Sequence, residues 1–212
     1  AGAEALLEEN LKMRGAQRAR MENDADWLAS IAGITERLGD IRRQRQDLDG
    51  ALHYYDATLE FREWLVEHYA DRPENRDGLL SILGRIGSVR YDMADLAGAG
   101  AIWARRLEEA RRFSADFPGE VSASIRLFDA LLSAGDAALA GGDGTRALAA
   151  YGEAAAGARS LLARDGRQAR LHYALAQSLK GAGWAHLARR DRPAAYAAFD
   201  EARAVMDGLT AQ

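Results

Sequence analysis

The chain of 212 residues contains no cysteine, only three prolines and only two lysines. The absence of cysteine excludes a disulfide framework, a cysteine-ligated zinc site and a thiol nucleophile. No apolar run approaches the roughly 18 residues of a membrane span, and no signal peptide opens the sequence. The net charge of −4 disfavours non-specific nucleic-acid binding, which needs a basic face. We therefore expect a soluble, helical, cytoplasmic protein that binds neither nucleic acid nor membrane.

Four kinds of residue recur every 48 positions: a glycine, an aspartate, an alanine and an aromatic residue. The four columns are Gly39, Gly87, Gly135 and Gly183; Asp47, Asp95, Asp143 and Asp191; Ala51, Ala99, Ala147 and Ala195; and Tyr55, Trp103, Tyr151 and Phe199. They keep one order with no insertion, which chance does not produce. The sequence therefore predicts internal repeats.

Each repeat is predicted to contain two amphipathic helices. Ile31, Thr35 and Leu38 fall at helical spacing, as do Ala51, Tyr55 and their equivalents in the later repeats. The recurrent aspartate stands just before the second helix, where its carboxylate can cap free N–H groups. The recurrent glycine lies within the first helix, where it costs about 1 kcal/mol relative to alanine. We expect it to permit close packing of the aromatic residue of the same repeat.

These columns resemble the tetratricopeptide repeat, whose signature is W-x2-L-G-x2-Y followed by A-x3-F. Leu38-Gly39 and Ile86-Gly87 match its first part, and Ala51-x3-Tyr55 matches its second part. The chain departs from the family in lacking the first tryptophan and the tyrosine after the glycine, and its period exceeds the usual one of about 34 residues. The resemblance implies an all-α, right-handed α-solenoid of stacked antiparallel helix pairs. Repeats of such long period are similar to those that accompany signalling, protease-like or kinase domains in large bacterial proteins.

The whole chain, residues 1–212, is expected to form one array. Ala1-Gly2-Ala3 aligns with Ala97-Gly98-Ala99 two periods later, so the chain is expected to open within an interior unit and to be a fragment of a longer protein. The predicted divisions are the second helix of a truncated repeat (1–23) and four repeats (24–71, 72–119, 120–167 and 168–212).

No residues are arranged as a catalytic or metal site is expected to be. His53, His68, His172 and His186 lack metal-ligand spacing, and no G-x-S-x-G motif occurs. Gly141-Gly142-Asp143-Gly144 lacks the lysine of a phosphate-binding loop and is predicted to be a turn between paired helices. We expect no enzyme activity, no metal and no cofactor.

The resemblance places the binding surface on the concave face, which the first helices line. The columns three residues before, one after and four after the glycine vary between repeats, and Gly84 and Leu132 occupy two of these positions. The candidate partner-binding side chains are Glu36, Asp40, Arg43, Ser88, Tyr91, Asp136, Leu139, Lys180, Trp184 and Leu187. Because Trp, Tyr and Arg are common interface hot spots, this face is a candidate recognition surface. The recurring Lys and Asn of the family's carboxylate clamp are missing, so binding of chaperone tails is not expected.

Three functions remain open. The first is a non-catalytic scaffold that binds a protein or peptide partner, or another domain of the same polypeptide. The second is a sensor that binds a small ligand or peptide and regulates an attached effector domain; a closed apolar pocket near Leu139, Trp184 and Leu187 would favour it. The third is weak self-association.

Overall fold

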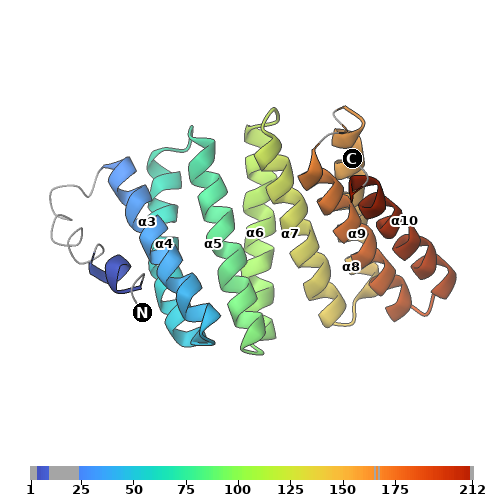
Figure 1. Cartoon of the computed structure of the whole chain (residues 1–212), viewed down its shortest axis with the longest axis horizontal. Helices are drawn as coiled ribbons and strands as arrows, with labels where there is room; N and C mark the ends of the chain where they lie inside the picture. Colours follow the sequence, from blue (N-terminus) through green and yellow to red (C-terminus); the bar gives the residue numbers. More distant parts are fainter. Residues whose placement is uncertain (1–3, 10–23, 165, 167, 211–212) are drawn as a thin grey trace. The chain divides into compact units, whose positions relative to one another are not determined.

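The computed structural model describes residues 4–9, 24–164, 166 and 168–210. Every regular element in these ranges is an α-helix (Figure 1), which confirms the predicted all-α class. Residues 4–9 are helical, and the longer helices are α3 (Ala25–Gln44), α4 (Leu48–His68), α5 (Pro73–Asp92), α6 (Leu96–Asp116), α7 (Val121–Ala140), α8 (Gly144–Leu162), α9 (Ala169–Ala188) and α10 (Arg192–Thr210). Most of the truncated repeat predicted at 1–23 lies outside the described residues.

The chain forms two compact units, residues 1–102 and residues 103–212, and α6 contributes to both. In the first unit α3 packs on α4 and α4 on α5. In the second, α7 packs on α8, α8 on α9 and α9 on α10, and the two first helices α7 and α9 also touch. Consecutive helices within each unit are antiparallel (Figure 1). Each unit therefore has the stacked helix-pair architecture of an α-solenoid.

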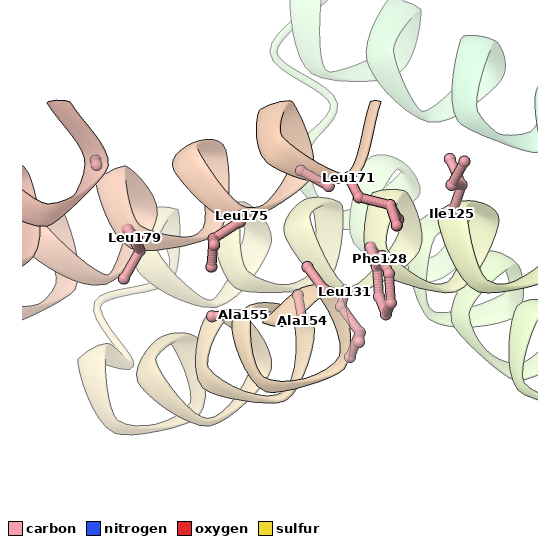
Figure 2. Close-up of a cluster of buried hydrophobic side chains, with 11 residues drawn as sticks. Ile125, Phe128, Leu131, Ala154, Ala155, Leu171, Leu175 and Leu179 are labelled. Carbon is pink, nitrogen blue, oxygen red and sulfur yellow. The ribbon is translucent and has the colours of Figure 1, made fainter. Parts of the chain in front are cut away.

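The core of the second unit lies between α7, α8 and α9. Phe128 and Leu131 of α7 pack with Ala154 and Ala155 of α8 and with leucines of α9 (Figure 2). The alanines of α8 let the helices approach closely. The members drawn and labelled are Ile125, Phe128, Leu131, Ala154, Ala155, Leu171, Leu175 and Leu179.

Two clusters of buried side chains among the described residues of the first unit involve α4. Tyr55 of α4 packs with Leu79, Leu83 and Ile86 of α5. Nearer the other end of α4, Leu65 packs against Trp27 and other side chains of α3. Each Å² of apolar surface removed from water contributes about 25 cal/mol, and this burial stabilises such helix pairs.

The recurrent glycines make room for aromatic rings, as predicted. A Cβ atom at Gly135 would lie 2.5 Å from the ring of Tyr151, and one at Gly183 would lie 2.5 Å from the ring of Phe199. At Gly39 a Cβ atom would overlap the ring of Tyr55 in the same way. In these three repeats the aromatic side chain of the second helix therefore packs directly on the backbone of the first.

The turn inside each helix pair has the same hydrogen bonds in all four repeats. In the first, Gln46 N–H donates to the carbonyl of Arg43 at 2.9 Å and Asp47 N–H donates to that of Arg42 at 3.0 Å. This is the Schellman motif, which requires a residue of positive φ. That residue has φ between 61° and 80° in every repeat, at Gln46, Ala94, Gly142 and Arg190. Gly141-Gly142-Asp143-Gly144 is therefore a turn, as predicted.

The recurrent aspartate follows this positive-φ residue and caps the next helix. In each repeat, its carboxylate accepts a hydrogen bond from the N–H of the residue three positions later. The donors are Gly50 at 2.9 Å from Asp47, Gly98 at 2.9 Å from Asp95, Arg146 at 2.9 Å from Asp143 and Ala194 at 3.2 Å from Asp191. The predicted capping role is confirmed four times.

Exchanging the positive-φ residues should change stability in opposite directions. Ala94→Gly is expected to raise the free energy of unfolding by about 0.5–1 kcal/mol, because a positive φ costs alanine more than glycine. Gly142→Ala should lower it by a similar amount, since no atom lies within 4 Å of the added Cβ and only the backbone strain changes. Urea unfolding followed by circular dichroism measures both. If both variants shifted the free energy of unfolding equally and in the same direction, the role assigned to the positive φ at these positions would be contradicted.

Candidate interaction surface

Glu36 and Asp40 on α3 both hold Arg85 of α5. The Nε of Arg85 donates to Glu36 at 2.8 Å, and its Nη1 lies 3.1 Å from an oxygen of Asp40. Burial alone would lower the pKa of Arg85, but the hydrogen bond to Glu36 and the charge of Asp40 outweigh it and raise the pKa. The Nη2 of Arg62 on α4 lies 3.7 Å from the other carboxylate oxygen of Glu36. These two predicted contact residues are thus part of an internal network that joins three helices.

The other three candidates of the first unit differ in their exposure and in the contacts of their side chains. Arg43 pairs with Asp92 at 2.8 Å between side chains that are 36% and 42% exposed, and such a solvent-accessible pair contributes only about 0–1 kcal/mol. The hydroxyl of Ser88 donates to the carbonyl of Gly84 in its own helix. Tyr91 is 46% exposed. Arg43 and Tyr91 are therefore the side chains that a partner can reach most directly.

A polar cavity of about 470 Å³ lies beside Arg43. Two arginines and two aspartates among its lining residues balance in charge, and the rest are polar apart from one leucine. The lining residues are Asp40, Arg43, Gln44, Gln46, Leu48, Arg85 and Asp92. Such a site is suited to a polar, uncharged or zwitterionic group rather than to a free anion.

In the second unit, Asp136 is the candidate with a structural partner. It accepts the hydroxyl of Tyr151 at 2.6 Å. The same bond joins Tyr55 to Asp40 at 2.6 Å in the first unit. Both tyrosines cross over a glycine of the first helix to reach these carboxylates. Asp40 and Asp136 therefore hold the helix pairs together, whatever else they bind.

This tyrosine–aspartate pairing was not predicted, although the sequence contains a signal for it. An aspartate follows the recurrent glycine only in the two repeats whose aromatic residue is tyrosine. In the other two repeats, with Trp103 and Phe199 in the aromatic column, the residue after the glycine is Ser88 or Trp184. The tyrosine of the second helix and the aspartate after the glycine thus occur together or not at all.

The remaining candidates of the second unit lie at the surface. Trp184 is 52% exposed, Lys180 is exposed, and Leu139 and Leu187 are half-buried. The edge of Trp184 packs on Phe199, with ring centroids 5.4 Å apart. Trp184 thus stands on open surface rather than inside a closed apolar pocket, so the observation that would have favoured the sensor is not found at this tryptophan. A further exposed aromatic residue of α9, Tyr173, was not among the candidates.

The Tyr151 hydroxyl makes the stability of the second unit sensitive to alkaline pH. Burial and the hydrogen bond to Asp136 raise the pKa of Tyr151 above its ordinary value. Because the phenol of the unfolded chain has a pKa of about 10, its contribution is complete below about pH 10 and is lost as the pH rises further.

Tyr151→Phe should therefore lower the free energy of unfolding at pH 7 by about 1.5–2 kcal/mol, the lower part of the range for a hydrogen bond to a charged group, because Asp136 is exposed. The variant should also lose less stability than the parent between about pH 10 and pH 12. Urea unfolding at pH 7 and at alkaline pH measures both effects. Tyr196→Phe, at a side chain 64% exposed, is the control. Parallel pH profiles for parent and Tyr151→Phe would contradict the account.

Within the described ranges, no group of three or more His, Asp or Glu side chains is placed to hold a metal ion. Among the same residues no helix is long and apolar enough to cross a bilayer.

Comparison with known proteins supports the fold. No family model matches the sequence, and no curated protein matches it. Among solved structures, BtubC (BKLC) from P. vanneervenii is similar with a TM-score of 0.55 and 15% identity, over 97% of this chain and 93% of that chain. MamA protein is similar with a TM-score of 0.38 and 16% identity, over 83% of this chain and 92% of that chain. The likeness to BtubC fits a tetratricopeptide-like helical array at the level of the fold alone.

Proposed function

We propose that this chain is a non-catalytic scaffold that binds a protein or peptide segment through the exposed side chains of its first helices. In this proposal it is divided into four repeats, at 24–71, 72–119, 120–167 and 168–212, and successive repeats begin 48 residues apart. Helix bounds support this division, because α3, α5, α7 and α9 begin at Ala25, Pro73, Val121 and Ala169. In this proposal the array belongs to a larger, multidomain bacterial signalling protein.

One observation carries the proposal: recurring positions are used for the framework, whereas exposed first-helix positions do not recur. The alanine column is at most 1% exposed in all four repeats, and the capping bonds are equivalent throughout. By contrast, Arg43, Tyr91 and Trp184 are chemically different; Tyr91 and Trp184 are exposed and Arg43 is partly exposed. A repeated frame with a variable face is the design by which solenoid proteins recognise partners.

Affinity capture from the lysate of the native organism tests this proposal. The whole chain is compared with the variant Arg43→Ala, Tyr91→Ala, Trp184→Ala. The control variant is Arg111→Ala, Tyr196→Ala, which removes exposed side chains of second helices. We expect the parent and the control to retain the same protein and the first variant to lose it while keeping its helical circular dichroism. Equal retention by all three would show that the choice of surface is wrong.

The polar cavity in the first unit favours a second candidate, the ligand-sensing regulatory domain. Its balanced charges and its two glutamines could hold a small zwitterion such as a free amino acid. A saturable rise in melting temperature with an amino-acid panel, lost in Arg85→Met, would support this function. If no amino acid of the panel raised the melting temperature, the cavity would no longer support a ligand-sensing function.

A further inference from the structure

The exposed face of α9 carries two aromatic residues with a lysine between them. Tyr173, Lys180 and Trp184 are seven and four residues apart, so they lie on one side of the helix. Tyr173 is 55% exposed and Trp184 52% exposed, and Lys180 is also exposed. The pair of aromatics spans roughly 16 Å along the helix axis at about 1.5 Å per residue. Among the described residues, α9 is the helix that carries two exposed tyrosine or tryptophan side chains.

The strip is not a general property of first helices in this unit. At the equivalent positions of α7, Ile125 is only 9% exposed, Leu132 is half-buried and Asp136 is bound to Tyr151. The α9 strip therefore replaces a packed and paired surface by an open one. Exposed tyrosine and tryptophan side chains lose little conformational freedom on binding and are common anchors of interfaces.

Trp184 and Lys180 are prepared for binding in different ways. Trp184 is fixed by its edge-to-face contact with Phe199, at an angle of 71° between the rings. Lys180, in contrast, has no hydrogen bond or ion pair with any described residue. A rigid indole with an exposed surface contributes affinity at low entropic cost. An unpaired cation beside it favours a carboxylate, although the chain as a whole has a net charge of −4.

We propose that this α9 strip binds an extended partner segment in which an acidic residue is flanked on both sides by apolar residues. The inference rests on the proposed scaffold function and names the chemistry of its partner. Lys180 lies roughly 6 Å along the axis from Trp184 and roughly 10 Å from Tyr173. An extended chain advances about 3.3 Å per residue. The apolar residues therefore stand two positions from the acidic residue on the Trp184 side and three positions on the Tyr173 side.

Capped hexapeptides provide the direct test. The probes are Leu-Ser-Ser-Glu-Ser-Leu and its reverse sequence, which cover both chain directions, together with versions that carry Gln or Lys in place of Glu. Binding to the whole chain is followed by NMR, through the indole N–H of Trp184 and the amides of α9. We expect one Glu peptide to bind saturably, with a dissociation constant on the order of 1 mM. Its Gln version should bind roughly threefold to fivefold more weakly, as expected for an exposed ion pair, and its Lys version should not bind.

Variants of the chain separate charge from apolar contact. Trp184→Ala should weaken binding of the Glu peptide by roughly tenfold or more, the effect of a hot-spot residue. Lys180→Glu should abolish the preference for Glu and favour the Lys peptide. The charge-matched control is Arg203→Glu on α10, where Arg203 pairs only with Asp200 of its own helix among the described residues, and it should bind like the parent.

Equal binding of the Glu and Lys peptides, or a binding site away from α9, would overturn the inference. A concentration-dependent dimer that Trp184→Ala abolishes would overturn it too, because a second copy would then be the occupant. A failure of every peptide to bind is the fourth contradicting result. If no peptide binds while the lysate partner is still captured and is lost in Arg43→Ala, Tyr91→Ala, the inference is wrong and the scaffold function stands.

Discussion

Replacing Gly39 by alanine is expected to lower the free energy of unfolding by about 2 kcal/mol. A Cβ atom there would overlap the ring of Tyr55, which is 0% exposed and therefore has nowhere to move. Overpacking of this kind typically costs about 1–3 kcal/mol or more, which exceeds the gain of about 1 kcal/mol in helix propensity. The same change at Gly135 meets Tyr151 and should behave alike.

The control for this substitution lies six residues earlier in the same helix. Gly33 has no atom within 4 Å of an added Cβ, so Gly33→Ala should raise the free energy of unfolding by about 0.5–1 kcal/mol. Urea unfolding of the two variants beside the parent measures the difference. If Gly39→Ala were as stable as Gly33→Ala, the recurrent glycine would not be a packing residue.

Truncating Phe128 is expected to have the largest effect on stability, a loss of about 3–5 kcal/mol. Phe128 is 4% exposed and belongs to the cluster that joins α7, α8 and α9 (Figure 2). Its ring also occupies the space left by Gly157 of α8, where a Cβ atom would overlap it. Phe128→Ala therefore leaves a cavity between three helices that alanines and a glycine cannot fill.

The matched control is Tyr196→Ala, which removes an aromatic side chain 64% exposed and should change stability by less than about 0.5 kcal/mol. Urea unfolding and hydrogen exchange of the amides of α7 to α9 report the loss. Unchanged exchange in α8 and α9 with Phe128→Ala would mean that the three helices do not share one core.

The helices and their caps were predictable because their causes are local in sequence. Asp47 and its three equivalents cap the helix that begins immediately after them, and the helical spacing of apolar residues needs no distant partner. The packing of glycine against an aromatic residue was also predictable, since only 16 positions separate Gly39 from Tyr55 and the pattern recurs.

The repeat pattern did not predict which surface side chains are already paired with side chains of other helices. Glu36 lies in an exposed column by position, but Arg85, 49 residues later, occupies its carboxylate. Asp40 is held by Tyr55 and Arg85 together. Whether a charged side chain can receive a partner depends on groups from other helices, which periodicity within one helix does not reveal. The positive φ of Gln46 was hidden for a similar reason, because only Gly142 among its equivalents is glycine.

Site-specific photo-crosslinking in the native organism tests the central proposal most directly, that partners bind the first-helix face. A photoreactive phenylalanine analogue replaces Tyr91 or Tyr173 on first helices, and Glu60 or Arg111 on second helices in matched chains, all four being exposed positions. We predict that a discrete crosslinked protein or peptide forms at Tyr91 or Tyr173 and not at Glu60 or Arg111. Crosslinks confined to Glu60 and Arg111 would contradict the proposal and assign recognition to the second helices.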